Sequence, residues 1–139
     1  MTLEQLVQRV ETRLCTLGKR LWNDPMAELR EEADRLAEDL QRSYAELEQS
    51  RSEKEALAQR VAAGEVNAAM LVSQIETYVH VGDQANAWRQ ALELDRVRQA
   101  LNRDQVRLAL QEAACRKHQA RIAQLEGRLT DLLGRLYPT

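Results

Sequence analysis

Few residues in this chain could carry out catalysis or hold a metal ion. The two cysteines, Cys15 and Cys115, form no CxxC pair and have no metal-ligand spacing, and Cys115 instead fits a packed position on a helix. His118 falls on the same kind of position, where packing explains it better than ligation does. Neighbouring glutamates such as Glu31 and Glu32 are typical of an exposed helix face. The sequence also lacks glycine-rich phosphate loops, HExxH and nucleophile elbows. We therefore expect no enzyme, no cofactor, no metal site and no small-molecule substrate.

The composition favours long helices over a compact globule. The 139 residues include 30% charged residues, five glycines, two prolines and no phenylalanine. This mixture is typical of coiled coils. No run approaches the ~20 apolar residues that span a bilayer, and the N-terminus lacks a secretory signal. A cytoplasmic all-α protein is expected, peripheral to the membrane if it touches one.

Residues 1–22 predict a short amphipathic helix. Its apolar side chains recur at helical spacing, and the segment carries a net charge of +2, from four basic and two acidic residues. Such a helix can bind the surface of an anionic membrane, or its stripe can dock on the rest of the chain or on another subunit. Sequence alone leaves these readings open. The candidate membrane-binding residues are Leu3, Leu6, Val7, Val10, Leu14, Leu17, Leu21, Trp22, Arg9, Arg13, Lys19 and Arg20.

Residues 23–139 predict an antiparallel coiled-coil hairpin. A helix break at Asp24–Pro25 precedes a first arm over about residues 25–80, and a second arm covers about residues 84–137. Both arms carry apolar heptad seams that become polar in the middle. The polar positions of the first seam are Ser43, Ser50 and Lys54.

The turn is expected at Val81, Gly82 and Asp83. Gly82 is suited to end a helix and Asp83 to cap the next one. Folding the chain there pairs residues whose numbers sum to about 164, which aligns the two polar middles. Residues 23–80 carry a net charge of −7 (thirteen acidic, six basic) and residues 81–139 one of +3 (seven acidic, ten basic). The basic residues are interleaved with acids and lack aromatic stacking partners, so an acidic arm beside a basic one is expected rather than a nucleic-acid site.

This layout resembles the phage-shock-protein A family, with its plastid relative the vesicle-inducing protein, in the bacterial branch of the ESCRT-III superfamily. The matching residues are Asp24–Pro25, Glu53–Lys54 with Leu57, Arg60 and Val61, and then Gly82, Asp83, Ala85, Arg89, Ala91 and Leu92. The stretch after the turn is a degenerate form of the family pattern, because its acidic-Leu pair is replaced.

The resemblance implies a membrane-associated stress-response protein. It implies an N-terminal helix that binds anionic membrane, self-association into larger assemblies, and a hairpin that in some members inhibits an AAA+ transcription activator. Members of the family continue with further helices that cross between subunits, whereas this chain ends at Thr139. The chain is therefore expected to be either a truncated form or a short paralogue, in which the membrane-sensing helix and the partner-binding hairpin remain.

Three interpretations follow. The first is a peripheral membrane adaptor that uses residues 1–22. The second is a soluble regulator whose hairpin binds a partner such as an AAA+ ATPase. The third is a structural coiled coil that dimerises through exposed apolar residues such as Trp88 and Leu110.

Overall fold

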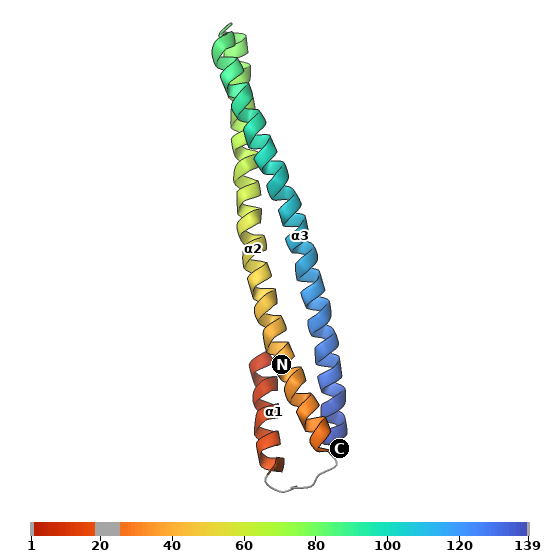
Figure 1. Ribbon diagram of the computed structural model, residues 1–139. Coiled ribbons are helices and arrows are strands. Elements are labelled where there is room, and N and C mark those ends of the chain that lie inside the picture. The colour runs from red at the N-terminus through yellow and green to blue at the C-terminus, as the bar shows by residue number, and fades with distance from the viewer. Residues whose placement is uncertain (1, 19–25, 139) are drawn as a thin grey trace. The chain divides into compact units, whose positions relative to one another are not determined.

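A computed structural model of the protein describes the backbone of residues 2–18 and 26–138 and the side chains of residues 2–12 and 26–138. These described residues fold into three helices. Helix α1 covers Leu3–Gly18, α2 covers Ala27–His80 and α3 covers Gln84–Leu136. The two long helices pack against each other as an antiparallel hairpin (Figure 1). The expected all-α hairpin, preceded by a short helix, is confirmed. The expected break at Asp24–Pro25 lies outside the described residues.

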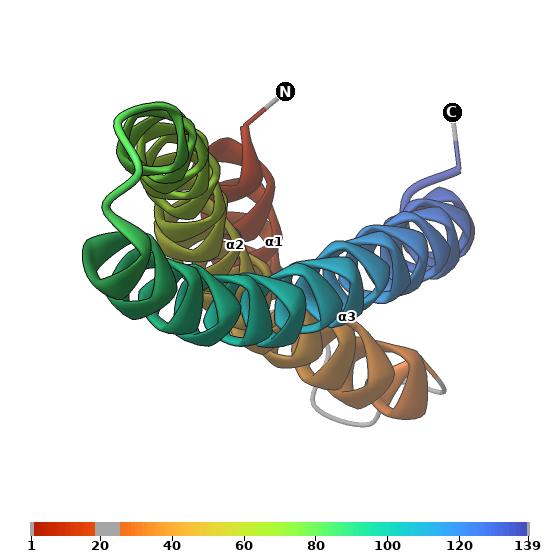
Figure 2. The same cartoon turned by 90° about the horizontal axis from the view of Figure 1, so that it is seen from above.

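A glycine-dependent cap ends α2. Gly82 has a φ of +78°, in the left-handed region that favours glycine. The Asp83 amide donates to the Tyr78 carbonyl at 2.9 Å, and the Gly82 amide donates to the Val79 carbonyl at 3.2 Å. These two hydrogen bonds define a Schellman motif, which pairs carbonyls that the helix end would otherwise leave open. The chain then reverses within residues 81–83 (Figure 2).

An aspartate starts α3 immediately after that turn. Oδ1 of Asp83 accepts a hydrogen bond from the Asn86 amide at 3.2 Å, and Oδ2 accepts one from the Asn86 side chain at 2.7 Å. A side chain that pairs a free amide in the first helical turn is the usual N-cap, worth about 1 kcal/mol. Gly82 therefore ends α2 and Asp83 caps the start of α3, as predicted from the sequence.

The contacts of the chain divide it into two compact units. One comprises residues 1–48 and 116–139, and the other comprises residues 49–115. The division cuts across both arms of the hairpin. We call the first the three-helix unit and the second the turn unit.

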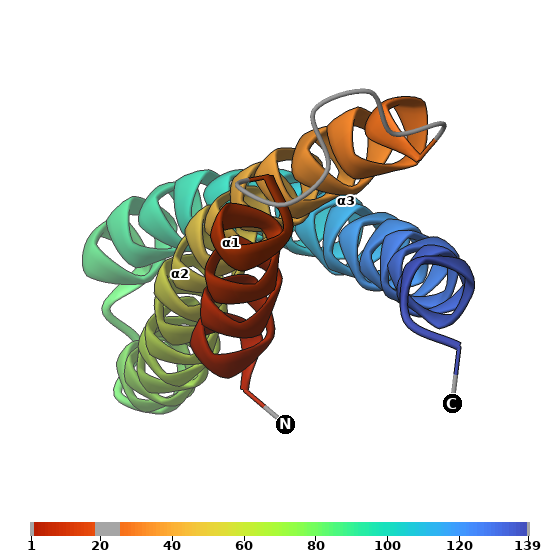
Figure 3. The same cartoon turned by 90° about the horizontal axis from the view of Figure 1, so that it is seen from below.

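The three-helix unit has the fuller core. Helix α1 lies beside α2 and runs in the opposite direction to it (Figures 1 and 3). Leu40 and Leu129 are fully buried, and Val10 of α1 is only 1% exposed. A third helix can close a seam that two helices leave partly open, because each helix can then cover two neighbours. The buried apolar residues of this unit are Val7, Val10, Ala33, Leu36, Ala37, Leu40, Leu47, Ile122, Leu125, Leu129, Leu132 and Leu136.

The turn unit has a thinner seam between two helices. Leu71 and Leu94 are its only large apolar side chains in the buried class among the described residues. Val61, Val97 and Leu101 along the same seam are half-buried. Gly64 lies inside α2, as expected, and a Cβ there would meet Cδ1 of Leu101 at 3.1 Å. The glycine thus lets the two helices approach closely at this point.

Candidate interaction surface of the N-terminal helix

The apolar stripe of α1 docks on the hairpin only in part. Val7 and Val10 are buried, whereas Leu3 and Leu6 are half-buried and Arg9 is exposed. Arg13, Leu14 and Leu17 lie within α1, but their side chains are outside the described part of the structure, as are Lys19, Arg20, Leu21 and Trp22 altogether. The structure therefore brings the described members of the predicted membrane-binding set onto the hairpin, with one edge of the stripe left open.

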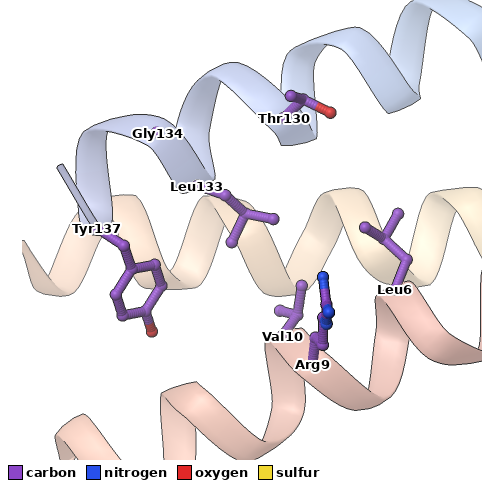
Figure 4. Close-up of a pocket in the computed structure, with 7 residues that line it drawn as sticks. All are labelled: Leu6, Arg9, Val10, Thr130, Leu133, Gly134 and Tyr137. Atoms are coloured by element: carbon purple, nitrogen blue, oxygen red, sulfur yellow. The ribbon is translucent and has the colours of Figure 1, made fainter. Parts of the chain in front are cut away.

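A pocket marks the open edge, between α1 and the end of α3. Its volume is about 330 Å³. Leu6, Arg9 and Val10 point from α1 towards α3, and Leu133 and Tyr137 point back from α3 (Figure 4). Thr130 and Gly134 complete the lining. The pocket is open to solvent, so part of the apolar surface of α1 stays unburied at this edge.

Acidic side chains oppose the docking of α1 on α2. The pKa of Asp34 is raised, first by burial and then by the charges of Glu38, Glu11 and Glu31. Glu11 belongs to α1, and the other three belong to α2. The contact between these helices thus places like charges together, which weakens it at neutral pH.

Polar contacts tie α2 to α3 within the same unit. The Tyr44 hydroxyl donates a hydrogen bond to Oε1 of Glu126, which raises the pKa of Tyr44. Nδ1 of His118 lies 3.6 Å from Oε2 of Glu46. His118 is half-buried and Cys115 is buried, so both are packed on the seam as the sequence suggested. These contacts join α2 to α3 directly.

Polar pairs also follow the expected register in the turn unit. Nη2 of Arg60 lies 3.1 Å from Oδ1 of Asp104, and Nε2 of Gln111 donates to Oε2 of Glu53 at 2.7 Å. Both pairs, like Glu46 with His118, join residues whose numbers sum to 164. The Arg60–Asp104 pair reverses the expected polarity, because its base lies on α2 and its acid on α3.

The residues of the turn are open to solvent at the end of the hairpin. Val81 is 68% exposed and Gly82 is exposed, while Asp83 is half-buried because it caps α3.

Two features are absent from the described part of the chain. No group of three His, Cys, Asp or Glu side chains there could hold a metal ion. No helix in residues 2–18 or 26–138 is both long and apolar enough to cross a bilayer.

The lining residues on α3 were not singled out from the sequence. Leu133 and Tyr137 lie beside the seam formed by Leu129, Leu132 and Leu136. The available signal was Leu133 itself, an apolar residue outside the heptad seam and one helical turn before Tyr137. A second apolar face at the end of an arm indicates that a third helix covers it.

No protein-family model, curated protein or solved structure matches the chain.

Proposed function

We propose that the protein is a non-enzymatic adaptor that binds anionic membrane surfaces through residues 1–22 and presents its hairpin to protein partners. In this proposal α1 leaves the hairpin and lays its apolar stripe on the membrane, at the inner face of the cytoplasmic membrane. The observation that supports it is the partial docking of α1, with Leu3 and Leu6 only half-buried and Leu6 lining an open pocket.

The energetics of the transfer favour a charge-dependent exchange. Burying a valine side chain stabilises by about 1.5–3 kcal/mol. Val7 and Val10 are covered by apolar groups both on the hairpin and in the interfacial layer of a membrane, so this free energy is similar in the two states. The balance then depends on charge. Each basic residue near an anionic surface contributes about 1 kcal/mol, and residues 1–22 contain four. Leaving the hairpin also separates Glu11 from Asp34.

Co-sedimentation of the intact chain with vesicles, with and without anionic lipid, tests the proposal. Binding is expected only to anionic vesicles and is lost when residues 1–22 are deleted. Val10→Asp abolishes binding, whereas Gln8→Asp, which adds the same charge on the exposed face of α1, retains most of it. Failure of the intact chain to bind, or equal effects of the two variants, contradicts the proposal.

A change on the hairpin separates release of α1 from membrane affinity. Leu133→Ser replaces an apolar side chain that lines the pocket beside α1, without altering residues 1–22. Binding to anionic vesicles is expected to strengthen, because the docked state that competes with the membrane is weakened. Ala123→Ser, at an exposed position of α3, is the matched control and leaves binding unchanged. Weaker binding by Leu133→Ser indicates that α1 acts from the docked position instead.

A further inference from the structure

The outer face of α3 in the turn unit carries large apolar side chains in solvent. Trp88 is 67% exposed, Leu92 49%, Val106 62% and Leu110 65%. They lie opposite the seam, where Leu94 and other residues face α2. Single exposed apolar residues are ordinary, but four on one helix face indicate a binding surface.

The spacing of this face reads the same in both directions. From Trp88 to Leu110, the seven residues of this face follow one another at intervals of 4, 3, 4, 4, 3 and 4 residues. Each half is an eleven-residue step of three turns, which stays on one face of a nearly straight helix. The hydrogen bond from Nε2 of Gln99 to Oδ2 of Asp95, at 3.1 Å, joins two members of the face. We call it the α3 stripe: Trp88, Leu92, Asp95, Gln99, Arg103, Val106 and Leu110.

From this palindrome we infer that the α3 stripe binds a second copy of this chain, with the two α3 helices antiparallel and Gln99 on the two-fold axis. Trp88 then lies opposite the partner's Leu110, and Leu92 opposite the partner's Val106. Asp95 lies opposite the partner's Arg103. Each contact occurs twice, as a closed two-fold interface requires. This inference does not depend on the proposed membrane function.

Charge complementarity favours a second copy of this chain as the partner, and it favours an antiparallel orientation of the two α3 helices. In the antiparallel arrangement each central carboxylate faces a guanidinium, on both sides of Gln99. A parallel arrangement would set Asp95 against the partner's Asp95 and Arg103 against the partner's Arg103, and like charges across an interface are strongly unfavourable. An arbitrary apolar partner would have no reason to match acid, amide and base in mirror order.

The thin core of the turn unit adds a physical reason for pairing. Most of its seam is half-buried, and a two-helix unit of this kind buries little apolar surface on its own. Pairing through the α3 stripe covers four large apolar side chains on each copy. The small Ala85 and Ala113 continue the palindrome beyond both ends, so the helices can stay close there.

Charge reversal in the intact chain tests the pairing directly. Sedimentation velocity over a concentration series is expected to show the wild-type chain reaching twice the monomer mass. Asp95→Arg alone and Arg103→Asp alone each place like charges opposite each other twice, and shift association to at least about tenfold higher concentration. A mixture of the two single variants restores association, because every central contact between them is then complementary.

Cross-linking tests the position of the axis. In a Cys15→Ser background, Gln99→Cys places one thiol of each copy at the axis, and a short bismaleimide is expected to join them in high yield. Gln105→Cys changes the same residue type at another exposed position, about 120° around the helix, and serves as the matched control with little product. Native Cys115 is buried and contributes no background.

The outcomes separate the inference from its competitors. A chain that remains monomeric at all concentrations overturns it. A dimer that tolerates both charge reversals, or that cross-links equally at positions 99 and 105, shows pairing through another face and overturns it as well. Every substituted position of α3 is exposed, so each variant is expected to fold. The helical signal in circular dichroism checks this.

Discussion

Arg60 and Asp104 meet across the hairpin with unequal burial. Nη2 and Oδ1 are 3.1 Å apart, and the arginine side chain is 60% exposed whereas the aspartate side chain is 11% exposed. The carboxylate occupies a seam position that an apolar residue would normally fill. This pair therefore contributes more to register than to stability, because a seam aspartate excludes other alignments.

Removing the base and replacing the acid should have opposite effects. Arg60→Ala is expected to lower the free energy of unfolding by about 1–3 kcal/mol, because it leaves the buried carboxylate of Asp104 without its partner. Asp104→Leu is expected to raise it by about 1–2 kcal/mol, because a buried charge is exchanged for an apolar side chain. Urea denaturation measures both. Destabilisation by Asp104→Leu contradicts this account of the seam.

The raised pKa of Asp34 predicts that acid strengthens the three-helix unit. Its folded-state pKa lies above the ordinary 3.8 because of burial, Glu38, Glu11 and Glu31. The folded state therefore binds the proton first as the pH falls, and stability rises between the raised pKa and 3.8. Asp34→Asn removes this dependence. The difference in Tm between wild type and Asp34→Asn, measured from pH 7 to pH 4, should narrow as the pH falls.

The hydroxyl of Tyr44 should contribute measurable stability through Glu126. Tyr44→Phe removes the hydrogen bond and is expected to cost about 1 kcal/mol, near the middle of the range for a net intramolecular hydrogen bond. Tyr78→Phe, close to the turn and remote from Glu126, is the matched control. Thermal unfolding should show a clearly larger loss for Tyr44→Phe, and equal losses would argue against this bond. Because the pKa of Tyr44 is raised above 10.0, its contribution should also fall as the pH rises past 10.0.

Replacing Gly82 and Gly127 with alanine should change the free energy of unfolding in opposite directions. Gly82→Ala forces a side chain into a left-handed conformation and is expected to cost about 1 kcal/mol. Gly127→Ala, inside α3 with nothing within 4 Å of the new Cβ, is expected to stabilise by up to about 1 kcal/mol. Chemical denaturation of the two variants checks the prediction. Stabilisation by Gly82→Ala would contradict the Schellman assignment.

The hairpin could be predicted because its signals are local and repeated. Heptad seams define each arm, and Gly82 with Asp83 marks a single reversal, so the register follows once the turn is placed. The burial of Ser43, Ser50 and Asp104 also fits, since heptad position decides which residues face the partner helix whatever their polarity.

The docking of α1 could not be predicted in the same way. An apolar stripe shows that something covers Val7 and Val10, but membrane, partner and hairpin all select the same residue types. The pocket that it shares with Leu133 and Tyr137 brings together residues far apart in the sequence, and no repeat links them. The polarity of Arg60 and Asp104 was likewise hidden, because segment charge does not identify individual pairs.

The order of synthesis determines when the pocket beneath α1 can form. Leu6, Arg9 and Val10 are synthesised well before Thr130, Leu133 and Tyr137, which line the same pocket. At roughly 5–20 residues per second, the ribosome needs about 6–24 s to add the ~120 residues between them. During that interval the nascent chain contains the amphipathic helix α1 but not yet the part of α3 that lines the same pocket. Whatever surface lies near the ribosome exit therefore meets this helix before its own hairpin is complete.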